Sequence, residues 1–305
     1  MNRTRLVLAT AFVTSALALT ACGSGGDPLA APSESAAPSD TIVVGSADFA
    51  ENALLAEIYA GALSAKGVKV TKKLNIGSRE TYIPGLEDGS IDLIPEYSGV
   101  LMQYFNKDAT ATSPDEVYTA LQSAVPTQLT VLEKAAAEDK DSITVTKETA
   151  DKYTLKSIAD LKPVAKDLVL GGPPEWKTRP TGAPGLKKVY GLEFKSFKAL
   201  DAGGPLTINA LKKGTVQAAD VFSTDPNIPA NGWVVLDDPN SLFAAQNIVP
   251  LINKAKASAT VTAALNAVSA KLDTPTLAEL VKKVVLDKGD PETVAKEFLT
   301  TSGLS

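Results

Sequence analysis

The chain has 305 residues and a formal net charge of −5, with one cysteine and no histidine. The lack of histidine excludes Ser-His-Asp and Cys-His nucleophile systems, histidine-ligated metals and the most common general base. The mildly acidic charge argues against nucleic acid or anionic lipid as a partner.

Residues 1–21 are typical of a bacterial signal peptide. Arg3 and Arg5 precede an apolar run from Leu6 to Leu19, which is too short to span a bilayer. The stretch Leu19-Thr20-Ala21-Cys22 resembles the lipobox, whose cysteine becomes the lipidated first residue of the mature protein. Cleavage elsewhere would leave Cys22 incidental, but a lone thiol in an exported protein calls for a role. We therefore predict that Cys22 carries a lipid anchor.

Residues 22–40 are rich in glycine, serine, alanine and proline and show no hydrophobic period, which predicts a flexible tether. No later apolar run is long enough for a transmembrane helix, so we expect membrane contact through the N-terminal lipid only.

The first part of the body alternates strands and helices. The hydrophobic pattern predicts strands at 42–45, 68–74 and 91–94, a helix at 51–66, a helix interrupted near Pro84, and a helix ending at Phe105. Proline cannot donate to a sheet ladder, so the third strand should stop at Pro95. Glu96 and Tyr97 then lie where a strand ends and a helix begins, and ligands of open α/β sheets bind at the carboxyl ends of strands.

The rest of the chain repeats this rhythm. Ser113-Pro114-Asp115-Glu116 predicts a helix start with a capping box, and Asp290-Pro291 predicts another capped start. Further strands are expected at 130–132, 143–146, 168–170, 218–222, 233–236 and 248–252 and near Phe197, with helices at 186–190, 206–213, 260–272, 276–286 and 291–299. These units predict an α/β protein with mainly parallel sheets, and 284 mature residues suit two units.

Three blocks in order resemble the glycine betaine/choline/carnitine-binding proteins, which are the substrate-binding subunits of osmoprotectant ABC importers. They are Gly-Ser-Ile-Asp-Leu-Ile-Pro-Glu-Tyr-Ser-Gly at 89–99, Glu-Trp-Lys-Thr-Arg-Pro-Thr-Gly-Ala-Pro-Gly-Leu at 175–186 and Phe-Ser-Thr-Asp at 222–225. The likeness runs from Thr41 to about Ile252, most of the mature chain.

The resemblance implies a two-lobe periplasmic-binding-protein fold of type II-like topology with a ligand cleft between the lobes. Residues 41–144 and 247–305 would form lobe 1, and residues 145–246 would form lobe 2. It also implies a monomeric, lipid-anchored receptor on the extracytoplasmic face of the cell membrane. Such a receptor passes a small solute to ABC permease subunits, is not an enzyme and needs no cofactor.

The family's aromatic cage for quaternary ammonium groups carries over only in part. Tyr97 is retained, and Phe222 keeps a ring without a hydroxyl. Ala183 and the Asp141-Ser142 pair stand where relatives can place rings, and Ala47 stands at a polar position. The full set of predicted ligand-binding residues is Ala47, Asp48, Gly77, Ser78, Tyr97, Asp141, Ser142, Trp176, Arg179, Ala183, Phe222, Ser223 and Thr224.

Several of these residues have two interpretations. Trp176 either refills pocket space or is a core or surface indole. Arg179 either binds a ligand carboxylate or forms a surface ion pair. Asp48 and Asp141 either pair with a cation or cap turns.

An incomplete cage leaves the ligand open. Glycine betaine or a related quaternary amine is the family default, and a larger, less charged aromatic or polyol-like molecule is the alternative. An Asp/Glu-based hydrolase and a sensor or adhesion lipoprotein are further alternatives.

Overall fold

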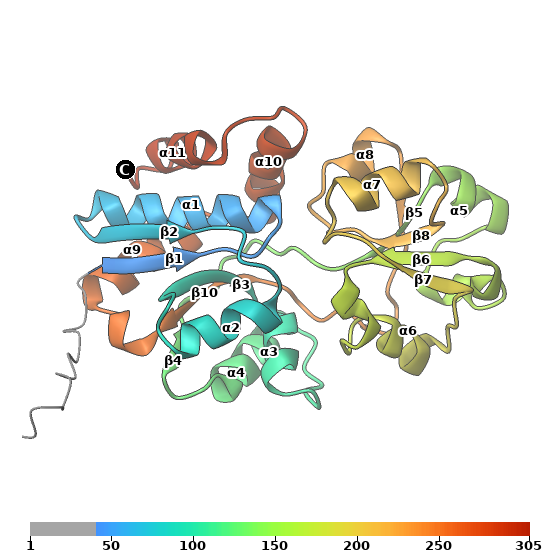
Figure 1. Ribbon diagram of the computed structural model, residues 1–305, viewed down its shortest axis with the longest axis horizontal. Coiled ribbons are helices and arrows are strands. Elements are labelled where there is room, and N and C mark those ends of the chain that lie inside the picture. The colour runs from blue at the N-terminus through green and yellow to red at the C-terminus, as the bar shows by residue number, and fades with distance from the viewer. Residues whose placement is uncertain (1–40) are drawn as a thin grey trace, which may run out of the picture. The chain divides into compact units, whose positions relative to one another are not determined.

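The computed structural model describes residues 41–305, which belong to one compact unit (Figure 1). The predicted signal peptide, tether and lipid anchor at Cys22 lie outside the described residues. Two five-stranded sheets organise the described part. Its helices include none that is long and apolar enough to cross a membrane.

The first sheet combines strands from both ends of the described chain. Its order is β2-β1-β3-β10-β4, with β1 at Thr41–Gly45, β2 at Lys69–Lys73, β3 at Leu93–Tyr97, β4 at Leu129–Val131 and β10 at Ile248–Asn253. β10 runs antiparallel to both of its neighbours, and the other four strands share one direction.

Helices cover both faces of the first sheet (Figure 1). α1 (Ala50–Ala65) packs on one face with α9 (Ala259–Ser269), α10 (Thr274–Val285) and α11 (Pro291–Thr301). α2 (Arg79–Glu87), α3 (Ser98–Phe105) and α4 (Pro114–Ala124) pack on the other. The apolar side chains of α1 are buried, and the predicted cap at Asp290 is present, because its side chain accepts a hydrogen bond from the Thr293 amide.

The second sheet has the same pattern of one reversed strand. Its order is β7-β6-β8-β5-β9, with β5 at Ile143–Val145, β6 at Val169–Gly172, β7 at Ser196–Ala199, β8 at Ala218–Asp220 and β9 at Val234–Val235. Here β5 is antiparallel to both neighbours. Each sheet is therefore mixed in its pairings but mainly parallel in strand direction.

Two apolar clusters cover the second sheet. One contains α5 (Lys147–Tyr153), α6 (Ala183–Tyr190) and the buried Trp176, and the other contains α7 (Pro205–Lys212) and the side chain of Ile228 in α8 (Asn227–Ala230). Four short 3₁₀ helices lie at Ile158–Leu161, Ala165–Asp167, Pro174–Lys177 and Lys254–Lys256.

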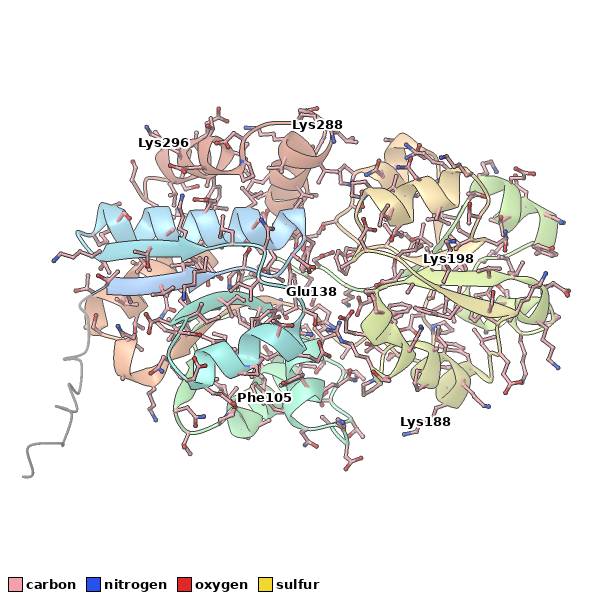
Figure 2. The ribbon with its side chains drawn as sticks, viewed as in Figure 1. Phe105, Glu138, Lys188, Lys198, Lys288 and Lys296 are labelled. Carbon is pink, nitrogen blue, oxygen red and sulfur yellow. The ribbon has the colours of Figure 1, made fainter. Side chains whose placement is uncertain are left out.

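The chain passes between the sheets along two segments that lie side by side. The backbone amide of Asp139 donates to the carbonyl of Gln246 at 3.1 Å, and Glu138 forms an isolated β-bridge with Asn247. Glu138, labelled in Figure 2, marks this place between the two sheets.

The prediction that β3 stops at Pro95 is wrong, because β3 continues to Tyr97. Pro95 lies opposite Pro250 of β10, and the Pro250 carbonyl faces β4, where it accepts a hydrogen bond from the Leu132 amide. The Pro95 carbonyl faces away from β10 and accepts a bond from Asn52 Nδ2 at 3.0 Å. Since N and O of a strand residue point to the same side, neither proline nitrogen lies where β3 and β10 exchange hydrogen bonds.

Two other local predictions also fail. α2 is not interrupted at Pro84 but runs through it to Glu87. Ser113 does precede α4, but its side chain donates to the Glu116 carboxylate at 2.7 Å instead of accepting from the backbone, so no capping box forms. Short polar side chains near a helix start can bond to one another as well as to the backbone.

Candidate functional site

A pocket with a cavity volume of about 310 Å³ lies between the two sheets. This volume is in the range of sites for small organic molecules. Its walls follow the carboxyl ends of β1, β3, β6, β7 and β8, as expected for α/β sheets. The lining residues are Ala47, Asp48, Phe49, Ser78, Arg79, Tyr82, Tyr97, Val100, Asp139, Asp141, Pro173, Pro174, Glu175, Arg179, Leu200, Asp201, Ala202, Asp220, Phe222 and Gln246.

The pocket brings together seven of the residues singled out from sequence. They are Ala47, Asp48, Ser78, Tyr97, Asp141, Arg179 and Phe222. The other six, which are Gly77, Ser142, Trp176, Ala183, Ser223 and Thr224, are not part of its lining. Ala183 is the first residue of α6 and is partly exposed, and Ser142 Oγ donates to the Val221 carbonyl within the second sheet.

Trp176 does not refill the pocket. Its side chain is 1% exposed and belongs to the core of the second sheet, where its ring stacks against Phe243 with centroids 6.1 Å apart. The structure therefore favours the interpretation of Trp176 as a core residue.

Three aromatic rings form a continuous group in the pocket wall. The Phe49 ring lies 5.0 Å from Phe222 and 5.9 Å from Tyr97, measured between centroids. Phe49 was not predicted, because the expected cage positions were those of the resembled family. Phe49 lies in the short loop between β1 and α1, immediately before the helix, and Tyr97 likewise lies where a strand passes into a helix.

Tyr97 is held by a buried carboxylate that also contacts the second half of the chain. The Tyr97 hydroxyl donates to Glu51 Oε1 at 2.8 Å, and the Thr224 hydroxyl donates to Glu51 Oε2 at 2.6 Å. Burial raises the pKa of Glu51, although both hydrogen bonds oppose this. Thr224 and Ser223 also hold Asp139, whose Oδ1 accepts from the Thr224 amide and the Ser223 hydroxyl. Ser223 and Thr224 thus hold pocket residues in place without lining the pocket themselves.

Acidic side chains dominate the charge of the lining. Six carboxylates line the pocket, namely Asp48, Asp139, Asp141, Glu175, Asp201 and Asp220, against two arginines. Burial, together with the charge of Glu51, raises the pKa of Asp139 well above its ordinary value. Burial and the charge of Asp141 do the same to the pKa of Asp220. Asp139 and Asp220 were also missed, although Asp220 lies within the strand predicted at 218–222, two residues before Phe222.

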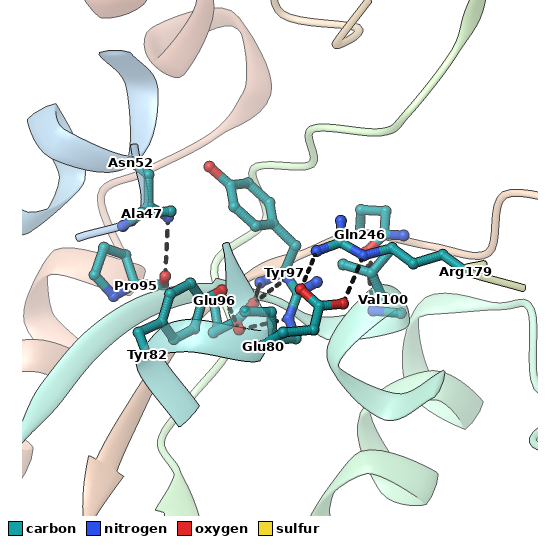
Figure 3. Close-up of polar contacts among 12 residues, drawn as sticks. Ala47, Asn52, Glu80, Tyr82, Pro95, Glu96, Tyr97, Val100, Arg179 and Gln246 are labelled. Carbon is teal, nitrogen blue, oxygen red and sulfur yellow. Dashed lines mark hydrogen bonds and ion pairs between the residues drawn. The ribbon is translucent and has the colours of Figure 1, made fainter. Parts of the chain in front are cut away.

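Both arginines of the lining already have carboxylate partners, and Figure 3 shows Arg179 beside Glu80. Arg79 binds Glu96 through two hydrogen bonds of 2.7 Å, and the Tyr82 hydroxyl donates to the same carboxylate. Arg179 binds Glu80 of α2 at 3.1 and 2.8 Å. Burial opposes ionisation of Glu80, but the hydrogen bonds and charge of Arg179 prevail and lower its pKa to about 2. Arg179 thus lines the pocket and forms the ion pair of one interpretation, and its binding of a ligand carboxylate stays a prediction.

The chain is similar to known substrate-binding proteins of transport systems. The model of a family described as the substrate binding domain of ABC-type glycine betaine transport systems matches residues 40–301. The glycine betaine-binding protein YehZ of Escherichia coli K12 is 27% identical over 286 residues, covering 89% of this chain and 93% of that protein.

A second relative and a solved structure extend the likeness. The ergothioneine transport permease/ergothioneine binding protein EgtU of Helicobacter pylori G27 is 25% identical over 266 residues, covering 86% of this chain and 48% of that longer protein. A crystal structure of a glycine betaine/carnitine/choline ABC transporter protein covers 86% of this chain and 99% of its own, with a TM-score of 0.68 and 24% identity. The two-sheet architecture is therefore that of the periplasmic binding proteins.

Proposed function

Because the chain belongs to the family of substrate-binding domains of ABC-type glycine betaine transport systems, we propose that it captures a small organic cation in the pocket between its sheets. Proteins of this family are extracytoplasmic, bind small solutes for permease subunits and are not enzymes. The default ligand is glycine betaine or a related quaternary amine, the kind of solute named for the relatives.

One observation carries this proposal: the rings of Phe49, Tyr97 and Phe222 meet in a pocket with an acidic lining. A quaternary ammonium group is attracted to aromatic faces by up to about 2 kcal/mol per ring when desolvated. The excess of carboxylates adds attraction for a positive charge. A neutral aromatic or polyol-like molecule has no charge for the carboxylates to attract, so the lining favours a cation over the less charged alternative.

Calorimetric titration of residues 39–305 with choline and glycine betaine tests the proposal. We expect saturable one-to-one binding, and Tyr97→Ala should weaken it at least about tenfold, because the ring contact is lost. Tyr190→Ala is a control, because that tyrosine lies outside the pocket lining and contacts Asp238. Turnover of the solute, or no binding of any organic cation, would contradict the proposal.

We further propose that Cys22 anchors the mature protein through lipid and that it acts as a monomer. The lipobox-like residues before Cys22 support the anchor. Cys22→Ser should release the protein into the soluble extracellular fraction, and persistent membrane attachment of that variant would refute the anchor.

A further inference from the structure

The pocket has more negative charge than its own residues neutralise. Both lining arginines are engaged, Arg79 by Glu96 and Arg179 by Glu80, and neither partner lies in the lining. The six lining carboxylates therefore face the cavity without a free basic side chain among the lining residues. A buried negative charge without a partner is costly, so such a site favours protonation or a bound cation.

Asp220 is the least satisfied of these carboxylates. Its side chain is 0% exposed and lines the pocket, and neither of its carboxylate oxygens has a hydrogen-bond partner among the described residues. Buried polar groups in folded proteins nearly always have partners, and exceptions call for an explanation. Asp201 shows the contrast, because its carboxylate accepts hydrogen bonds from the amides of Leu206 and Thr207 at the start of α7.

Asp220 does not face the cavity alone. The half-buried Asp141 lies close enough to act on it electrostatically, and both line the same pocket. Asp220 is also only two residues from Phe222, whose ring belongs to the aromatic group. A ligand in this cavity thus meets adjacent carboxylates and, beside them, aromatic surface.

We propose that the solute has a charged end with N–H donors, an ammonium or guanidinium group bound by Asp220 and Asp141, and an apolar body against Phe49, Tyr97 and Phe222. This inference rests on the proposed solute-binding function and names the class of solute. A quaternary ammonium group has no hydrogen to donate, so it leaves the lone pairs of Asp220 unsatisfied. An N–H cation supplies charge-assisted hydrogen bonds, which are about twice as strong as neutral ones.

A series of benzylamines with increasing N-methylation distinguishes binding through N–H donors from binding of a quaternary ammonium group. Benzylamine, its N-methyl and N,N-dimethyl derivatives and benzyltrimethylammonium share one apolar ring and are all cations at pH 7, but the number of N–H donors falls from three to none. We expect the dissociation constant to rise along the series, at least about tenfold from the first to the last, because hydrogen bonds to Asp220 are lost.

The variant Asp220→Asn tests whether Asp220 accepts these hydrogen bonds. The amide keeps the shape of the side chain and removes the buried charge, so the variant should fold and unfold no more readily than the parent protein. It should bind benzylamine at least about tenfold more weakly. It should also lose most of the preference for benzylamine over its more methylated derivatives. Glu175→Gln makes the same change of charge at a partly exposed position of the same lining, and it should keep the preference.

The outcomes distinguish this inference from the function on which it rests. The inference is overturned if benzyltrimethylammonium binds most tightly, or if Asp220→Asn keeps the same order and spread of dissociation constants across the series. Either result leaves a receptor for quaternary amines in place. Absence of binding by all four amines, choline and glycine betaine overturns both.

Discussion

Glu51 connects the two sides of the pocket through hydrogen bonds. It receives one hydrogen bond from Tyr97 of the first sheet and one from Thr224, which follows β8 of the second sheet. Its neighbours Asp139 and Asp225 are also acidic, and burial raises the pKa of all three. These three acids, at and behind the pocket wall, therefore hold their protons more tightly in the folded chain than in the unfolded one.

Stability should consequently fall as pH rises. A carboxyl whose pKa is raised by folding stabilises the fold fully below its unfolded pKa, and this contribution is lost as pH rises through the folded value. For Glu51 the window opens near its ordinary pKa of 4.5 and extends upward. We expect a larger free energy of unfolding at pH 5 than at pH 8 in urea titrations. Glu51→Gln should reduce this difference, and an unchanged difference would show that Glu51 does not titrate there.

Among the elements, α3 depends on a side chain from a distant part of the sequence. Gln246, which is 1% exposed, accepts hydrogen bonds at Oε1 from the amides of Gly99 and Val100, each at 3.0 Å. These are amides of the first helical turn, which have no partner within the helix. A Cβ on Gly99 would lie 2.6 Å from the Ala245 carbonyl, so glycine lets the two segments meet at this point.

Gln246→Ala should therefore lower the free energy of unfolding by about 1–3 kcal/mol, because two buried donors lose their acceptor. Chemical denaturation can measure this loss. Gln128→Ala removes an equal number of atoms from an exposed position before β4 and should change stability by less than about 0.5 kcal/mol. Equal effects of the two substitutions would mean that the contacts to α3 contribute little.

Strands and helices were easier to predict than the ends of elements and the pocket lining. Hydrophobic period depends on burial, so α1, β10 and α11 were found almost to the residue. The prediction that β3 ends at Pro95 failed because the side to which the Pro95 nitrogen points matters only relative to β10, which lies more than 150 residues away. Asp220 lies within the strand predicted at 218–222, but its lack of hydrogen-bond partners is seen only in the folded chain.

At the scale of the whole described chain, the two sheets are joined by crossing segments and by side-chain contacts across the pocket. The Arg179–Glu80 ion pair is one of these contacts, since Arg179 follows β6 of the second sheet and Glu80 lies in α2 beside the first. We propose that the two predicted lobes move about the crossings, with all of β5 in the second lobe because Ile143 and Thr144 pair within the second sheet. The ion pair would then favour the arrangement in which the pocket is enclosed.

Glu80→Gln should accordingly speed the release of bound benzylamine about two- to fivefold, consistent with a contribution of up to about 1 kcal/mol from a partly exposed ion pair. Stopped-flow displacement can measure the dissociation rate. Glu193→Gln breaks the exposed pair between Lys187 and Glu193, which lies within the second part only, and should leave the rate unchanged. The same acceleration in both variants would assign the effect to net charge.

The facing prolines of β3 and β10 bear on how evolution can vary this site. A slip of one residue between the strands would turn one proline nitrogen inward, to a position where the ladder needs a donor, and would leave a carbonyl of the other strand unpaired. Pro95 and Pro250 thus penalise misaligned pairing more than any two residues with an N–H would. Because Tyr97 lies two positions after Pro95, the same penalty keeps its ring facing the pocket, so residues around the ligand can diversify without loss of alignment.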